Sequence, residues 1–93
     1  MIKSFGDKET QRIFEGERIR TLHSDIQERA LRRLVQIHRA VSLDDLRHPP
    51  SNHLERLRGK LNKYHSIRIN QQWRVVFIWT GVDAENVSIL DYH

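Results

Sequence analysis

The stretch HSIRINQQWRVVFIW, residues 65–79, decides the fold of this chain. Its larger apolar residues recur at every second position on both sides of Gln71 and Gln72. Because successive side chains of a β-strand point to opposite faces, this period of two predicts two strands, each with one face turned toward a core. The polar residues between them predict the tight turn of an antiparallel hairpin.

The length of that turn sets which residues face each other. A two-residue loop would put Ile69 opposite Arg74 and so mix the apolar and charged faces. A three-residue loop at 70–72 instead pairs Ile69 with Trp73 and Arg68 with Arg74, and its asparagine tolerates the positive φ that such a loop needs. We predict this second register. The two arginines then lie side by side, which is unfavourable unless a bound anion, water or nearby acids offset their charges.

Residues 86–92 predict a further strand near the C-terminus. Val87 and Ile89 would point to the core, so the residues that alternate with them would lie on the face of the two arginines. The chain then ends with an acid, a phenol and an imidazole, three side chains suited to proton transfer or hydrogen bonding: Asp91, Tyr92 and His93.

The first half of the chain predicts helices. After a short strand at 2–5, Asp7 is a suitable N-cap for a short helix that Gly16 ends. Ser24 and Gln27 have the spacing of a capping box, which predicts that a second helix starts there. Its apolar stripe is formed by residues three and four positions apart: Ile26, Ala30, Leu34, Ile37 and Val41.

Together these elements predict a single α+β domain spanning residues 1–93. Its antiparallel sheet would contain the N-terminal strand and three or four C-terminal strands, and both N-terminal helices would pack on one face. The chain around 54–57 would cover part of the arginine face.

The composition is that of a basic globular protein. Sixteen Lys and Arg against twelve Asp and Glu give a net charge of +4, and twelve of the sixteen are arginine, whose planar fork binds phosphate bidentately. No acid interrupts the basic residues of 56–74, which points to a polyanion partner about as strongly as to a solvated face. The arginines of the second helix are expected to be solvated, with partner binding as the alternative: Arg29, Arg32, Arg33 and Arg39.

Several absences exclude other classes of function. The chain has no cysteine, so disulfides and thiolate metal sites are excluded. Its longest apolar run, 75–79, is too short to span a membrane, and the N-terminus lacks the features of a signal peptide. The scattered histidines have no metal-ligand spacing. We therefore expect a cytoplasmic protein without metal or cofactor.

Several short motifs, taken together, resemble one protein family. They are Leu54-Glu55-Arg56-Leu57-Arg58-Gly59, His65-Ser66-Ile67-Arg68-Ile69-Asn70, Gln72-Trp73-Arg74, Phe77 and the terminal Asp91-Tyr92-His93. In this combination the C-terminal part of the chain is similar to the HigB branch of the RelE/ParE toxin superfamily, including its GraT-like members. The resemblance implies a RelE-like fold.

The resemblance also implies a function. Members of this family are toxins of type II toxin–antitoxin modules, small metal-independent ribonucleases that cut mRNA in the ribosomal A site by acid–base attack of the 2′-hydroxyl. The expected partners are the 70S ribosome, mRNA and a helix-turn-helix antitoxin of the HigA type, with operator DNA contacted only through the antitoxin complex. Two alternatives stay open: a DNA gyrase inhibitor of the ParE type, and a noncatalytic RNA- or ribosome-binding module.

The functional residues of the family map onto this chain by motif. The terminal motif maps onto Asp91-Tyr92-His93, the catalytic arginine onto Arg74, and the basic residue before the family's glycine onto Arg58. Metal-free cleavage needs positive charge at the phosphate and proton transfer at two oxygens, so the arginines would supply the charge and the terminal residues the proton chemistry. Further phosphate contacts are expected from Arg56, Lys60, Lys63 and Arg68.

One position departs from the family's pattern. Many HigB proteins carry a catalytic histidine three residues before the basic position, and that role falls here on Glu55. A carboxylate can act as a base, but it cannot bring positive charge to a phosphate. His53, with the same strand parity, is the alternative substitute. The general base and general acid therefore stay unassigned, and we expect weaker cleavage than in relatives that carry the histidine.

Overall fold

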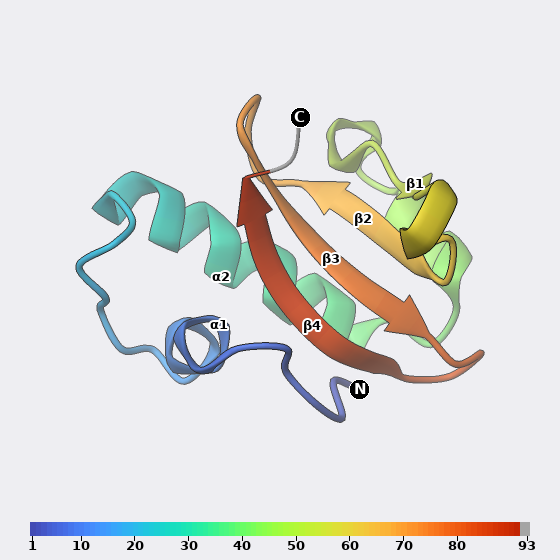
Figure 1. Cartoon of the computed structure of the whole chain (residues 1–93), viewed down its shortest axis with the longest axis horizontal. Helices are drawn as coiled ribbons and strands as arrows, with labels where there is room; N and C mark the ends of the chain where they lie inside the picture. Colours follow the sequence, from blue (N-terminus) through green and yellow to red (C-terminus); the bar gives the residue numbers. More distant parts are fainter. Residues whose placement is uncertain (92–93) are drawn as a thin grey trace.

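The computed structural model describes residues 1–91, and its elements confirm the α+β architecture (Figure 1). Two helices, α1 (Lys8–Phe14) and α2 (Ser24–Arg39), precede a four-stranded sheet. The strands are β1 (Glu55–Arg56), β2 (Tyr64–Arg68), β3 (Trp73–Trp79) and β4 (Ala84–Asp91), in this order across the sheet, each antiparallel to the next. Three short 3₁₀ helices lie in the connections before and after β1: η1 (Leu43–Arg47), η2 (Pro50–Asn52) and η3 (Gly59–Leu61).

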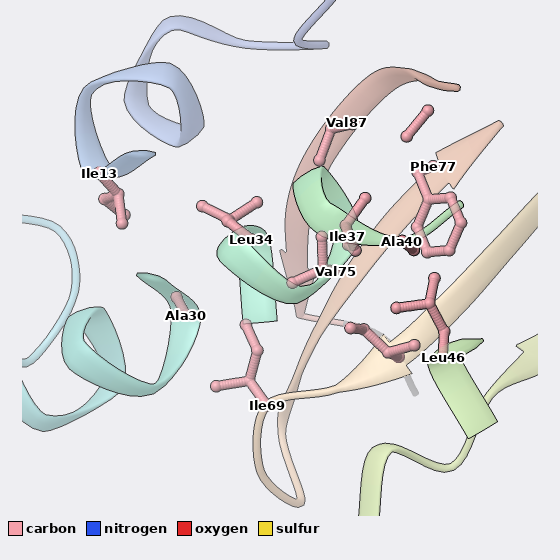
Figure 2. Packing of buried hydrophobic residues seen from close by; sticks show 12 residues of the cluster. Ile13, Ala30, Leu34, Ile37, Ala40, Leu46, Ile69, Val75, Phe77 and Val87 are labelled. Atoms are coloured by element: carbon pink, nitrogen blue, oxygen red, sulfur yellow. The ribbon is translucent and has the colours of Figure 1, made fainter. Parts of the chain in front are cut away.

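Both α-helices lie on one face of the sheet. In Figure 1, α2 passes behind β3 and β4, and α1 lies beside it. The stripe of α2 buries Ala30, Leu34 and Ile37 against Val75 and Phe77 in one hydrophobic cluster (Figure 2). Burying a side chain of the size of leucine or phenylalanine contributes about 1.5–3 kcal/mol, so this cluster is the main stabilising feature of the domain. Among residues 1–91, no helix is both long and apolar enough to cross a membrane.

The predicted hairpin register is confirmed. Arg68 pairs with Arg74 across β2 and β3. The reason that we gave for the loop is wrong, because Asn70 is not among the residues with positive φ. Its side-chain Oδ1 instead accepts hydrogen bonds from the backbone N–H groups of Gln72 (2.9 Å) and Trp73 (2.7 Å). The asparagine therefore closes the loop through its side chain, as turn asparagines commonly do.

The two helix starts differ from each other. Asp7 caps α1 as predicted, since its carboxylate accepts the backbone N–H of Thr10 at 2.7 Å. The capping box at Ser24 is wrong: the N-cap of α2 is His23, whose Nδ1 accepts the N–H of Asp25 at 3.2 Å. The Gln27 side chain is not available for the cap, because it bonds to the backbone of residues 19 and 22 in the preceding link.

The apolar stripe predicts that α2 extends to Val41, but the helix is shorter. The helix ends at Arg39, and the side chain of Val41 is 77 % exposed instead of covering the core. The chain turns away because the carboxylate of Asp45 accepts the N–H groups of Val41 and Ser42 at 3.0 and 3.2 Å. These bonds lower the pKa of Asp45. The chain then forms η1.

The N-terminal segment reaches the sheet beside β4 but does not form a regular strand. It makes two isolated parallel bridges, Ile2 with Ala84 and Phe5 with Val87. At Gly6 the N-terminal segment lies so close to β4 that a Cβ atom on residue 6 would overlap the hydroxyl of Ser88. The expected N-terminal strand is thus reduced to point contacts along an otherwise antiparallel sheet.

Candidate functional site

The face of the sheet away from the helices buries two polar side chains. Arg74 is 7 % exposed and Ser66 is fully buried. Leu57 and Val76 are buried too, but they lie outside the main hydrophobic cluster. The polar pair therefore sits in a second, smaller buried region.

Three acceptors hold the guanidinium group of Arg74. Its Nε donates to Ser66 Oγ at 3.1 Å, and its Nη2 donates to the backbone carbonyl of His53 at 3.0 Å. The same Nη2 lies 3.5 Å from the carboxylate of Glu55, whose side chain is 59 % exposed. Burying a charge is costly unless it is paired and hydrogen-bonded, and these contacts meet that need. The result is a buried cation whose carboxylate partner stands at the solvent rim.

The structure places the carboxylate of Glu55 beside Arg74 on the arginine face. Glu55 pairs with Ser66 across β1 and β2, and its contact with Arg74 confirms that the chain around β1 covers part of this face. The strand parity assigned to His53 is wrong. It lies before β1 in a left-handed conformation (φ 46°), and its side chain is exposed. His53 contributes its backbone carbonyl to Arg74.

Arg68 is half-buried and lies directly opposite Arg74. Its backbone carbonyl accepts a hydrogen bond from Arg33 Nε at 2.9 Å, so α2 reaches the end of β2. Arg33 is therefore not the solvated charge that we expected. Its partial burial lowers its pKa, and the positive charges of Arg29 and Arg32 lower it further.

The other predicted phosphate contacts lie on the β1 side of the sheet. Arg56 and Arg58 are exposed and, with Glu55 and Leu57, line a surface depression. Arg56 has the opposite strand parity from Glu55, and its Nε donates to the carbonyl of Asn62 at 3.0 Å. Arg58 precedes η3 as its N-cap residue.

In residues 1–91, the two predicted lysines make no polar contact with Arg74 or Glu55. Lys60 lies in η3 and Lys63 in the turn before β2, and both side chains are exposed. Within residues 1–91, neither lysine forms a hydrogen bond or ion pair with Arg74 or Glu55. They remain candidates for contacts with a larger polyanion.

Of the terminal motif, only Asp91 belongs to the described part of the chain. It pairs with Trp73 at the hairpin end of the sheet, and its carboxylate accepts a hydrogen bond from Gln72 Nε2 at 3.0 Å. Tyr92 and His93 lie outside the described residues. Their proton chemistry stays a prediction.

Two further residues have roles that the sequence reasoning missed. Ser66 holds Arg74, and its place on the arginine face followed from strand alternation, although nothing in the sequence marked its hydroxyl as the partner of Arg74. His65 stacks on Phe77 on the helix side, with ring centroids 6.3 Å apart. Burial lowers the pKa of His65, and the charges of Arg56 and Arg47 lower it further. Among residues 1–91, no three His, Asp or Glu side chains gather to hold a metal ion.

Comparison with known proteins identifies the family. The model of the HigB-like toxin family, described as RelE-like toxin of type II toxin–antitoxin system HigB, matches residues 3–93. The chain is 37% identical over 94 residues to "Toxin HigB-1" of Vibrio cholerae serotype O1, a match that covers 100% of this chain and 98% of the relative. It is 34% identical over 90 residues to an uncharacterized protein of Haemophilus influenzae, covering 96% and 88% of the two chains. The chain therefore belongs to the HigB-like family of RelE-like toxins from type II toxin–antitoxin systems.

Proposed function

We propose that this toxin is a ribosome-dependent mRNA endonuclease that cuts mRNA in the ribosomal A site and so inhibits translation and growth. The observation that carries the proposal is the Arg74 guanidinium, buried on the sheet face away from the helices and held by Ser66 and the carbonyl of His53. A preorganised cation of this kind stabilises the charge that develops on a phosphate during cleavage without having to reorganise.

The proposed reaction needs no metal. A general base removes the proton of the 2′-hydroxyl, the oxygen attacks the adjacent phosphate, and a general acid protonates the 5′-oxygen that leaves. Arg74, with Arg58 at the nearby rim, would stabilise the charged intermediate. Asp91, Tyr92 and His93 would supply the general acid and contact the nucleotide, and histidine is the residue type suited to the acid because its ordinary pKa is near neutral.

In this scheme, Glu55 changes its contacts when RNA binds. Its carboxylate lies on the Arg74 guanidinium, where a phosphate oxygen would make the same charge-assisted contact. RNA binding would therefore move Glu55 away from Arg74, and the displaced carboxylate would then be placed at the substrate. This proposal gives Glu55 the base role that the family assigns to a histidine.

A type II toxin has an antitoxin partner, and we propose that it is a helix-turn-helix protein of the HigA type. The 70S ribosome and mRNA would be the targets, the cytoplasm the place of action, and operator DNA would be contacted only through the antitoxin complex. Arg56, Arg68, Lys60 and Lys63 would add phosphate contacts.

To test this proposal, the parent chain, Arg74→Ala and His93→Ala are each expressed in cells. Growth is followed, and cleavage of ribosome-bound mRNA is measured by primer extension. We expect arrest and discrete cleavage for the parent and a loss of cleavage of about 10²–10³-fold for Arg74→Ala, the usual cost of removing one group that stabilises a transition-state charge. Arg12→Ala, an exposed arginine of α1, is the matched control and should cleave like the parent. Arrested growth with intact mRNA would contradict the proposal, and inhibited DNA supercoiling would then favour a gyrase inhibitor.

A further inference from the structure

Three arginines form a cluster on one flank of α2. Arg32 and Arg33 stand three and four positions after Arg29, which places both of them beside Arg29 on the helix surface. Arg29 and Arg32 are exposed, and both act electrostatically on Arg33, whose pKa their charges lower. The three positive charges therefore gather on one side of the helix.

Carboxylates nearby do not neutralise this cluster. Asp25 and Glu28 stand four positions before Arg29 and Arg32, the spacing at which helical ion pairs form. Among residues 1–91, however, none of the three arginines takes part in an ion pair, and Asp25 lies against His23 instead. The three guanidinium groups are therefore available to an anion from outside the chain.

Arg33 connects the cluster to the sheet. Arg33 Nε donates to the backbone carbonyl of Arg68 at 2.9 Å, which fixes the α2 flank against the end of β2. Arg68 lies opposite Arg74. Arg33 thus ties the cluster to the backbone of β2, whereas the side chain of Arg68 shares the face of Arg74, away from the helices.

We propose that Arg29, Arg32 and Arg33 form a docking surface for the phosphate backbone of a folded RNA, separate from the strand that is cut. The choice of RNA rests on the proposed function. It is supported by the composition of the surface, because guanidinium groups bind phosphates through a planar fork. Protein partners are usually bound through buried aromatic or aliphatic anchors, and the exposed large apolar side chains lie elsewhere: Met1, Val41, Leu61, Val82 and Leu90.

Binding of a fluorescein-labelled 2′-O-methyl RNA hairpin tests the surface without any cleavage, because this RNA has no free 2′-hydroxyl. Anisotropy titrations from low to physiological salt compare the parent with Arg29→Gln/Arg32→Gln. Each phosphate contact contributes about 0.9 to the slope of log K against log salt, so we expect the slope to fall by about 2 in this variant. Arg33 is left unchanged because it also supports the backbone of β2.

Two further variants control for charge and folding. Arg12→Gln/Arg39→Gln removes the same number of charges from exposed positions near the ends of α1 and α2 and should keep the parental slope. Arg29→Lys/Arg32→Lys retains the charge and should recover most of the slope. An unchanged slope in the cluster variant, or an equal fall in the control, would overturn the proposal.

The other outcomes separate this surface from its rivals. If the cluster variant loses binding to poly-L-glutamate but keeps its RNA affinity and slope, the surface binds an acidic protein segment and the proposal fails. If the parent does not cut ribosome-bound mRNA but binds the hairpin through the cluster, the endonuclease assignment fails while the docking surface stands. If the cluster variant cuts mRNA normally and shows the parental slope, only the docking surface fails.

Discussion

The two faces of the sheet are stabilised in different ways. On the helix side, Ile67, Val75 and Phe77 are fully buried and belong to the core cluster formed with α2. On the opposite side, Ser66 and Arg74 are buried as well, and their stability depends on hydrogen bonds with particular partners. The first face tolerates any well-packed apolar set, whereas the second needs specific polar atoms at specific places.

This difference supports the proposal that the arginine face serves function. An apolar residue in place of Arg74 would avoid the cost of desolvating a charge, and replacing buried ion pairs by hydrophobic groups is often neutral or stabilising. A protein selected only for stability has little use for this arrangement. The arginine face is therefore where we expect substitutions to alter cleavage more than stability.

The largest effect on stability is expected on the helix side. Phe77→Ala should lower the free energy of unfolding by about 3–5 kcal/mol, because it removes a fully buried ring and leaves a cavity. Urea denaturation followed by circular dichroism measures this loss. Val82→Ala, at a side chain that is 65 % exposed, is the control and should stay within about 0.5 kcal/mol of the parent. A loss below about 1 kcal/mol for Phe77→Ala would contradict the packing described for this face.

The arginine face should respond differently to loss of a hydroxyl. Ser66→Ala leaves the buried Nε of Arg74 without its acceptor, which should lower the free energy of unfolding by about 1–3 kcal/mol. Because Ser66 acts through Arg74, cleavage should slow through kcat with KM nearly unchanged. Ser88→Ala is the matched control, since Ser88 shares this face but makes no hydrogen bond to Arg74 in the described chain. A variant that is destabilised but keeps full kcat would rule out the positioning role.

His65 should make the helix side sensitive to acid. Its pKa in the folded state is lowered, so between the folded value and the ordinary value of about 6.5 the unfolded chain binds more protons. This contribution to stability is complete above about pH 6.5, falls as the pH drops through that value, and levels off below the folded pKa. Denaturation of the parent and His65→Gln across pH 5–8, a window set by about one pH unit around that value, measures the difference. Parallel curves for the parent and His65→Gln would count against the prediction.

The smallest effect is expected at the rim of the arginine face. Glu55→His removes the carboxylate from Arg74 and restores the residue type that the family pattern places there. We expect cleavage to rise by a few-fold, since an imidazole has a pKa nearer to neutral than a carboxylate. Glu55→Gln, which only removes the charge, separates release of Arg74 from the gain of a base. A slower Glu55→His variant would contradict the expectation of weak cleavage in the parent.

The hairpin and its register were predictable because strand alternation and loop length are local properties. Moving the register by one residue would turn every apolar side chain to the wrong face, so the pattern allows one good solution. The cap of α2 was not predictable in the same way. Ser24 and Gln27 fit a capping box, but the contacts of Gln27 with residues 19 and 22 depend on how the preceding link folds back.

The site was predictable in part for the same reason. Arg68 and Arg74 could be placed side by side from strand parity, and the motifs pointed to Glu55, Arg58 and Asp91. The partners of Arg74 could not be named, because Ser66 and His53 are 8 and 21 residues away from it in sequence. His53 acts through a backbone carbonyl, which no residue type encodes.

By itself, the sequence determined the α+β class, the hairpin register and the residue types that point to phosphate chemistry, because these depend on short-range periodicity and on motif. Only the tertiary structure decided that Arg74 is buried, that Glu55 rather than His53 brings a side chain to it, and that Arg33 of α2 binds the backbone carbonyl of Arg68. The physical reason is that burial and charge pairing depend on segments distant in sequence. Their approach is set by the packing of the whole domain.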